Sequence, residues 1–81
     1  MTWNYRVCKE TYGNGTQNVE IGYSIREAYY NKNGGIWAVT ERAKSPYGES
    51  IEEIKHCLEL MRLALNKEVI DLDTFVFENN N

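Results

Sequence analysis

The change of hydrophobic period at residues 45–54, Ser-Pro-Tyr-Gly-Glu-Ser-Ile-Glu-Glu-Ile, constrains the fold more than any other feature of this chain. Apolar residues before it alternate with a period of two, whereas those after it recur with a period near 3.6. Pro46 cannot donate to a sheet ladder, and Ser50 with Glu53 three residues later forms the capping-box pattern that begins a helix. The junction therefore predicts a sheet followed by one covering helix.

Three strands are predicted before this junction, and they cover residues 3–8, 19–30 and 36–42. Turn residues separate them: Asn14-Gly15 after the first strand, and the Asn-Lys-Asn-Gly-Gly run at 31–35 after the second. Trp37 lies in the third strand, which is apolar on both faces. Such a strand is typical of the centre of a sheet, or of a strand with one face against another subunit.

The second strand has a clear inner face up to its middle and an ambiguous one after it. Val19, Ile21, Tyr23 and Ile25 share the inner face. After Ile25 the alternation slips, because Glu27 occupies the apolar register. Either a bulge near residues 26–27 restores the alternation, or Tyr29 continues the inner face and Tyr30 points outward.

One amphipathic helix is predicted from about Ile51 to Asn66. Its apolar stripe, with spacings of three and four, consists of Ile51, Ile54, Leu58, Met61 and Leu65. We expect this stripe to lie flat against the inner face of the sheet. Leu60 and Leu63 project away from the stripe, at about 100° per residue.

The predicted fold is α+β, a three- to four-stranded antiparallel sheet in the order β-β-β-α with the helix packed on one face. Phe75 and Phe77 alternate with their neighbours and are candidates for a short fourth strand. One domain is expected over residues 1–78, and residues 79–81 are expected to form a disordered C-terminal tail.

The small size of the chain favours self-association. An 81-residue chain buries only about 60–65% of the surface that its unfolded form exposes, so its stability is marginal without help. Small proteins obtain that help from disulfides, metals or association. Cys8 and Cys57 allow at most one bridge and have no metal-ligand spacing, so we expect reduced thiols in a cytoplasmic protein. The expected partner is a second copy of the chain, giving a homo-oligomer such as a dimer, or another protein.

The sequence offers no signal for a membrane or a secretory pathway. The N-terminus lacks the apolar run of a signal peptide, and no apolar stretch approaches the roughly 20 residues that cross a bilayer. We therefore expect no membrane partner.

No constellation of catalytic residues can be assembled. His56 is the sole histidine, and its neighbour Cys57 lies about 100° around the helix, so the two do not form a catalytic pair. Glu49, Glu52 and Glu53 cluster at the helix start, where capping and the helix dipole explain them. We therefore predict a non-enzymatic protein, and assign no catalytic, cofactor-binding or metal-binding residue and no cofactor.

Two tryptophans and six tyrosines raise the possibility of base stacking on nucleic acid. Arg6, Arg26 and Arg42 lie one to a strand, but acidic residues share those strands and the net charge is −3. Phosphate binding requires an excess of basic residues, so nucleic acid is not the expected partner.

The leading prediction is a small protein-interaction or self-assembling module. Leu60 and Leu63 lie one turn apart outside the apolar stripe, on a domain that is short of core. Together with Trp37 and Phe75 or Phe77, they form the candidate interface. The alternative is an antitoxin-like or nucleic-acid-associated regulatory protein.

Two resemblances accompany these predictions. The segments Trp-Asn-Tyr-Arg-Val at 3–7, Tyr-Ser-Ile-Arg-Glu-Ala-Tyr-Tyr at 23–30 and Ser-Pro-Tyr-Gly-Glu-Ser at 45–50 resemble a family of small bacterial proteins of unknown function. Three strands followed by Gly48-Glu49-Ser50 at the start of an amphipathic helix are similar to the HicB-type antitoxin domain. That resemblance implies a β-β-β-α unit that neutralises a small RNase toxin, usually beside a separate DNA-binding segment.

Overall fold

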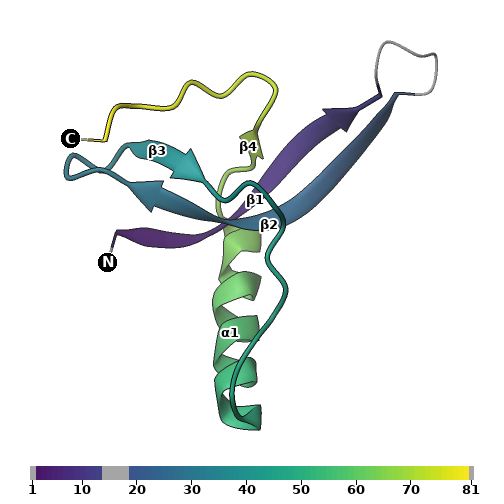
Figure 1. Ribbon diagram of the computed structural model, residues 1–81, viewed down its shortest axis with the longest axis vertical. Coiled ribbons are helices and arrows are strands. Elements are labelled where there is room, and N and C mark those ends of the chain that lie inside the picture. The colour runs from purple at the N-terminus through teal and green to yellow at the C-terminus, as the bar shows by residue number, and fades with distance from the viewer. Residues whose placement is uncertain (1, 14–18, 81) are drawn as a thin grey trace.

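The computed structural model describes residues 2–13 and 19–80. Its elements in chain order are β1 (Trp3–Tyr12), β2 (Glu20–Tyr30), β3 (Ile36–Val39), α1 (Ile51–Leu63), the 3-10 turn η1 (Ala64–Asn66) and β4 (Ile70–Asp71). The four strands form one sheet in the order β3-β2-β1-β4 (Figure 1). The predicted α+β class is confirmed.

The prediction of a purely antiparallel sheet is wrong, because β4 pairs with β1 in parallel. This pairing joins Cys8 to Ile70 and Lys9 to Asp71. The fourth strand therefore precedes Phe75 and Phe77, and the described residues 75–77 carry no strand. After α1 the chain returns to the free edge of β1. It runs along that edge in the same direction as β1, so the new pair is parallel.

The long β1–β2 hairpin keeps one register from Trp3↔Tyr29 to Tyr12↔Glu20. The bulge considered near residues 26–27 is therefore wrong, and Tyr29 shares a face with Ile25, as the alternative required. The other half of that alternative, Tyr30 pointing outward, is wrong, because Tyr30 packs against the buried cluster. The irregularity lies between Tyr29 and Tyr30, where β2 pairs with β3. The unbroken register keeps Arg26 and Ala28 on the buried face.

The predicted turn at residues 31–35 is confirmed. Asn31 donates its N–H to the Gly35 carbonyl at 2.7 Å, and its side-chain oxygen accepts the N–H groups of Asn33 and Gly35, both at 2.9 Å. Gly34 has a φ of 87°, a value that favours glycine. The turn predicted at Asn14-Gly15 lies outside the described residues.

The sheet has two faces of different character. The face that we call the closed face carries the core residues Cys8, Ala28, Ile36 and Ile70, with Tyr30, Val39, Leu72 and Phe75 packed against them. The open face, on the other side of the same strands, carries Trp3, Tyr5, Val7, Ile21, Tyr23, Ile25 and Tyr29. The segment after β4 runs on the side of the sheet opposite α1 (Figure 1). The larger buried cluster is therefore on the closed face and does not include α1.

The start of α1 confirms the predicted cap. The Ser50 hydroxyl accepts the Glu53 N–H at 3.1 Å, and the Glu53 carboxylate accepts the N–H of Glu49 at 2.9 Å. The carboxylate thus reaches one residue further back than in the standard capping box. The helix ends at Leu63 and continues as η1 to Asn66, which agrees with the predicted span.

The expected packing of the helix stripe on the sheet is wrong. Met61 is buried and Ile54 is half-buried, but Ile51, Leu58 and Leu65 are 69%, 48% and 67% exposed. Their expected partners on β2 are exposed as well, including Ile21 and Tyr23. Ile70 and the chain after it cover the closed face, whereas α1 lies on the other side of the sheet and makes its main sheet contacts with β1. The helix consequently projects away from the sheet (Figure 1).

Candidate interaction surface

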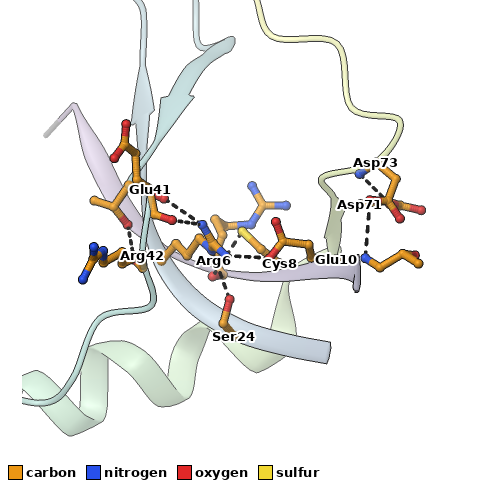
Figure 2. A network of polar contacts seen from close by, with 11 residues as sticks. Arg6, Cys8, Glu10, Ser24, Glu41, Arg42, Asp71 and Asp73 are labelled. Atoms are coloured by element: carbon orange, nitrogen blue, oxygen red, sulfur yellow. Dashed lines mark hydrogen bonds and ion pairs between the residues drawn. The ribbon is translucent and has the colours of Figure 1, made fainter. Parts of the chain in front are cut away.

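A buried arginine on the closed face fixes the segment that leads into the helix. The Arg26 guanidinium donates to the carbonyl oxygens of Thr40 and Glu41 at 3.1 and 2.6 Å, to the Ser24 hydroxyl at 3.1 Å, and to the Glu10 carboxylate at 3.2 Å. Figure 2 labels three of these acceptor residues, Glu10, Ser24 and Glu41. Arg26 is only 7% exposed. Because these bonds join β1 and β2 to the start of the β3–α1 connection, they help to set where the helix begins.

A second arginine fixes the other end of the helix. Arg6 donates to the Tyr30 hydroxyl at 3.0 Å and to the Glu68 carbonyl at 2.6 Å, just beyond η1. Arg6 and Arg26 therefore both act within the fold, and only Arg42 of the three arginines considered at the sequence level is exposed. The three do not form a row of cations along a groove.

The last turns of α1 rest on β1. Met61 and Ala64 are buried, Val7 on the open face is buried, and both α1 and η1 contact β1. The Tyr5 hydroxyl and the Cys57 sulfur lie 3.6 Å apart. Burial, and then the contact with Cys57, raises the pKa of Tyr5 to about 12. The phenol thus remains protonated and packs as a neutral group.

A broad groove of about 480 Å³ runs along one side of the helix. It is lined by Tyr5, Tyr47, Glu52, Glu53, His56, Cys57 and Leu60. Glu53 is engaged in the helix cap, and among the described residues His56 makes no side-chain hydrogen bond. No cluster of three metal-ligating side chains occurs in residues 2–13 and 19–80. The groove therefore brings His56 and Cys57 together without the bonded nucleophile, base and orienting group that nucleophilic catalysis uses.

A smaller depression of about 250 Å³, which we call the notch, lies between the helix and the start of β1. Its lining consists of Trp3, Asn4, Tyr5, Leu60, Leu63 and Lys67. The Trp3 and Tyr5 rings meet edge to face, with centroids 5.2 Å apart. Leu60 and Leu63 are 37% and 45% exposed. The two leucines that stand outside the helical stripe thus form an apolar surface with aromatic residues of the open face.

The candidate interface predicted from sequence divides between the two sides of the sheet. Trp37 lies on the open-face side, with its ring 6.0 Å from that of Tyr29, the residue paired with Trp3. Leu60 and Leu63 are on this side as well. Phe75 packs against the closed-face core. The ring of Phe77 meets the ring of Phe75 edge to face, with centroids 4.9 Å apart. The structure therefore brings three of the five residues to one side.

The opposite flank of the helix carries an apolar strip that sequence reasoning had assigned to the core. We call Ile51 and Leu58 of α1 and Leu65 of the adjoining η1 the ridge of α1. These residues are seven apart in sequence and therefore share one line along the helix. At about 100° per residue, the ridge and the pair Leu60 and Leu63 lie on different sides of the helix. The apolar stripe runs along the whole helix, whereas β1 contacts only part of it. The length of the stripe was therefore the signal in the sequence for an exposed ridge.

The shape of the whole chain is extended for its size. The radius of gyration is 14.3 Å, whereas a compact domain of this length has one of about 12 Å. The accessible surface is 6167 Å², against roughly 5000 Å² for a compact monomer of 9.4 kDa. The excess is roughly 1200 Å², and apolar residues of α1 and of the projecting half of the β1–β2 hairpin contribute to it.

Comparisons of the chain with protein-family models, with curated proteins and with solved structures gave no match. Among the described residues, no helix is both long and apolar enough to span a membrane. The proposals that follow therefore depend on the geometry of the chain.

Proposed function

We propose that this chain is a non-enzymatic protein-interaction module. Its contact surface consists of the exposed apolar sides of α1 and the adjoining open face of the sheet. The observation that carries this proposal is the excess of roughly 1200 Å² of accessible surface over that of a compact monomer. A protein partner of standard size covers about 800 Å² on each side, so the excess is large enough for one complete interface.

The chemical character of the surface supports the same proposal. Trp3 and Tyr5 stand beside Leu60 and Leu63, and Trp37 packs on Tyr29 on the same side of the sheet. Aromatic residues are the type most enriched in the buried centres of protein interfaces. A 13-residue helix is also only marginally stable in water unless its apolar side is packed. Here only its last turns rest on the sheet. A partner that covers α1 would supply the missing packing.

An antitoxin-like role, which the resemblance to HicB-type domains suggests, is the second proposal. The chain has three strands followed by a helix, in the order of that domain. A likeness of element order alone carries no activity. Such a role would also require a protein partner, and the same exposed surface of α1 would be available to a small RNase.

Site-specific photo-crosslinking tests the interaction module. A benzophenone amino acid at Leu63, in the notch, should give one discrete covalent adduct when the protein is irradiated in cells. The same amino acid at Lys32, in the exposed β2–β3 turn, is the control and should give none. An adduct with a small RNase would favour the antitoxin-like role. Equal labelling at the two positions, or none at either, would refute the module.

A further inference from the structure

We infer that the ridge of α1 binds the ridge of a second copy of this chain, forming a two-fold dimer in which the two helices run antiparallel. This inference rests on the proposed function and names one partner of the module, a second copy of the chain on the ridge. The occupied surface is Ile51, Leu58 and Leu65, on the flank of the helix away from the notch. The notch is left available to a different protein.

The spacing of the ridge suits pairing with itself. A two-fold dimer uses the same patch on both subunits, so the patch must complement its own rotated copy. Leu58 stands seven residues from both Ile51 and Leu65. An axis at Leu58 places the two Leu58 side chains together and brings Ile51 of each copy against Leu65 of the other. The ridge supplies one of the two apolar positions of each heptad in a helix pair, and Ile54 and Met61, at the other position, are half-buried and buried.

The position of the sheet decides the direction of pairing. The C-terminal end of α1 is attached to the sheet, whereas its N-terminal end projects (Figure 1). Parallel helices would bring two sheets to the same end of the pair, where they would compete for space. Antiparallel helices place each projecting end beside the other copy's sheet. The ridge is about 21 Å long, because 14 helical rises of 1.5 Å separate Ile51 from Leu65.

The surroundings of the ridge favour burial against a second copy. The charged residues beside it are paired within the helix, Lys55 with Glu52 at 4.0 Å and Arg62 with Glu59 at 3.0 Å. The notch lies toward Trp3, so the ridge is on the side of the projecting hairpin, where Ile21 and Tyr23 of the open face are 57% and 65% exposed. A partner helix on the ridge would therefore bring its first turn toward further apolar surface. A stable dimer covers roughly 800 Å² per subunit, and the ridge, together with the apolar surface of the hairpin beside it, belongs to the excess of roughly 1200 Å² that the whole chain exposes.

Two measurements test the dimer. Light scattering of the purified protein at micromolar concentration should give twice the mass of 9.4 kDa, and Leu58→Glu should halve that value while the near-ultraviolet circular dichroism shows that the sheet is still folded. Lys32→Glu, on an exposed turn, is the matched charge control and should remain a dimer. A monomeric wild-type protein would overturn the inference.

Cysteine crosslinking tests the direction of the helices. In a Cys57→Ser background, oxidised Leu58→Cys should form a covalent dimer. A mixture of Ile51→Cys and Leu65→Cys proteins should crosslink to each other more than either does to itself. Self-linking of Ile51→Cys as the main product would indicate parallel helices and refute the proposed geometry. If the protein is monomeric but the probe at Leu63 still captures another protein, the second-copy inference fails and the interaction module stands.

Discussion

Replacement of Arg26 by methionine should strongly destabilise the fold, because this cation joins three parts of the chain. Its guanidinium makes four hydrogen bonds, to Ser24, Thr40, Glu41 and Glu10, in a position that is 7% exposed. Methionine preserves much of the apolar stem and removes the charge and all four bonds. The connection to α1 would then lose its attachment to the sheet.

The loss of stability depends on whether the groups that lose their contact with Arg26 stay buried or regain water. Removing one partner of a buried ion pair costs about 3–5 kcal/mol when the other charge stays buried. The Glu10 side chain is 35% exposed and can regain water, so we expect about 2–3 kcal/mol. For a domain of this size, each kcal/mol lowers Tm by about 4–8 °C, and the total decrease should be roughly 10–20 °C.

Urea denaturation followed by tryptophan fluorescence measures this loss directly. Arg42→Met is the matched control, since Arg42 is exposed and its side chain forms no ion pair within the described residues. That variant should stay within about 0.5 kcal/mol of the wild type. Glu10→Gln should lose less than Arg26→Met, because the carbonyl and hydroxyl contacts of Arg26 remain. If Arg26→Met and Arg42→Met have the same free energy of unfolding, the network does not support the fold.

Three further predictions concern the helix cap, the Tyr5 phenol and the two thiols. Ser50→Ala should lower the free energy of unfolding by about 1 kcal/mol in urea titrations, while Ser50→Asp should retain it. Tyr5 should lose its proton near pH 10 when unfolded and near pH 12 when folded, so its contribution is complete below pH 10 and is lost as the pH rises through 12. In denaturation curves across that window, Tyr5→Phe should show a shallower decline than the wild type, and equal slopes would contradict the assignment. Burial also raises the pKa of the Cys8 thiol, so a thiol reagent should modify Cys57 in the native protein and Cys8 only after unfolding.

The local structure of this chain could be predicted from its sequence because local chemistry determines it. The cap at Ser50 and the turn at Asn31 depend on side chains that bond to nearby backbone groups, and both formed as expected. The alternation in β2 also identified which residues share a face.

The side of the sheet that holds the core could not be predicted in the same way. Both faces of the hairpin carry apolar residues, and the choice depends on where Ile70, Leu72 and Phe75 return after the helix. Alternation describes each face without saying which one the later chain will cover. The helix stripe was therefore assigned to the sheet, although much of it is exposed.

The candidate interaction surface was predicted in part. Leu60 and Leu63 were identified because they did not fit the helical stripe, and the structure places them beside Trp3 in the notch. The ridge was missed because an amphipathic pattern records that a face is apolar, not what covers it. Phe75 and Phe77 as interface residues, like the protein partner itself, stay predictions.

The parallel pairing of β4 with β1 has a consequence for the order in which the molecule is made. Cys8 and Ala28 leave the ribosome early, but Ile70, which completes their cluster, is synthesised about forty residues after Ala28. At 5–20 residues per second this delay is roughly 2–8 seconds. During that interval the nascent hairpin has one side unprotected, and chaperones that hold extended apolar segments would have their best opportunity to bind it.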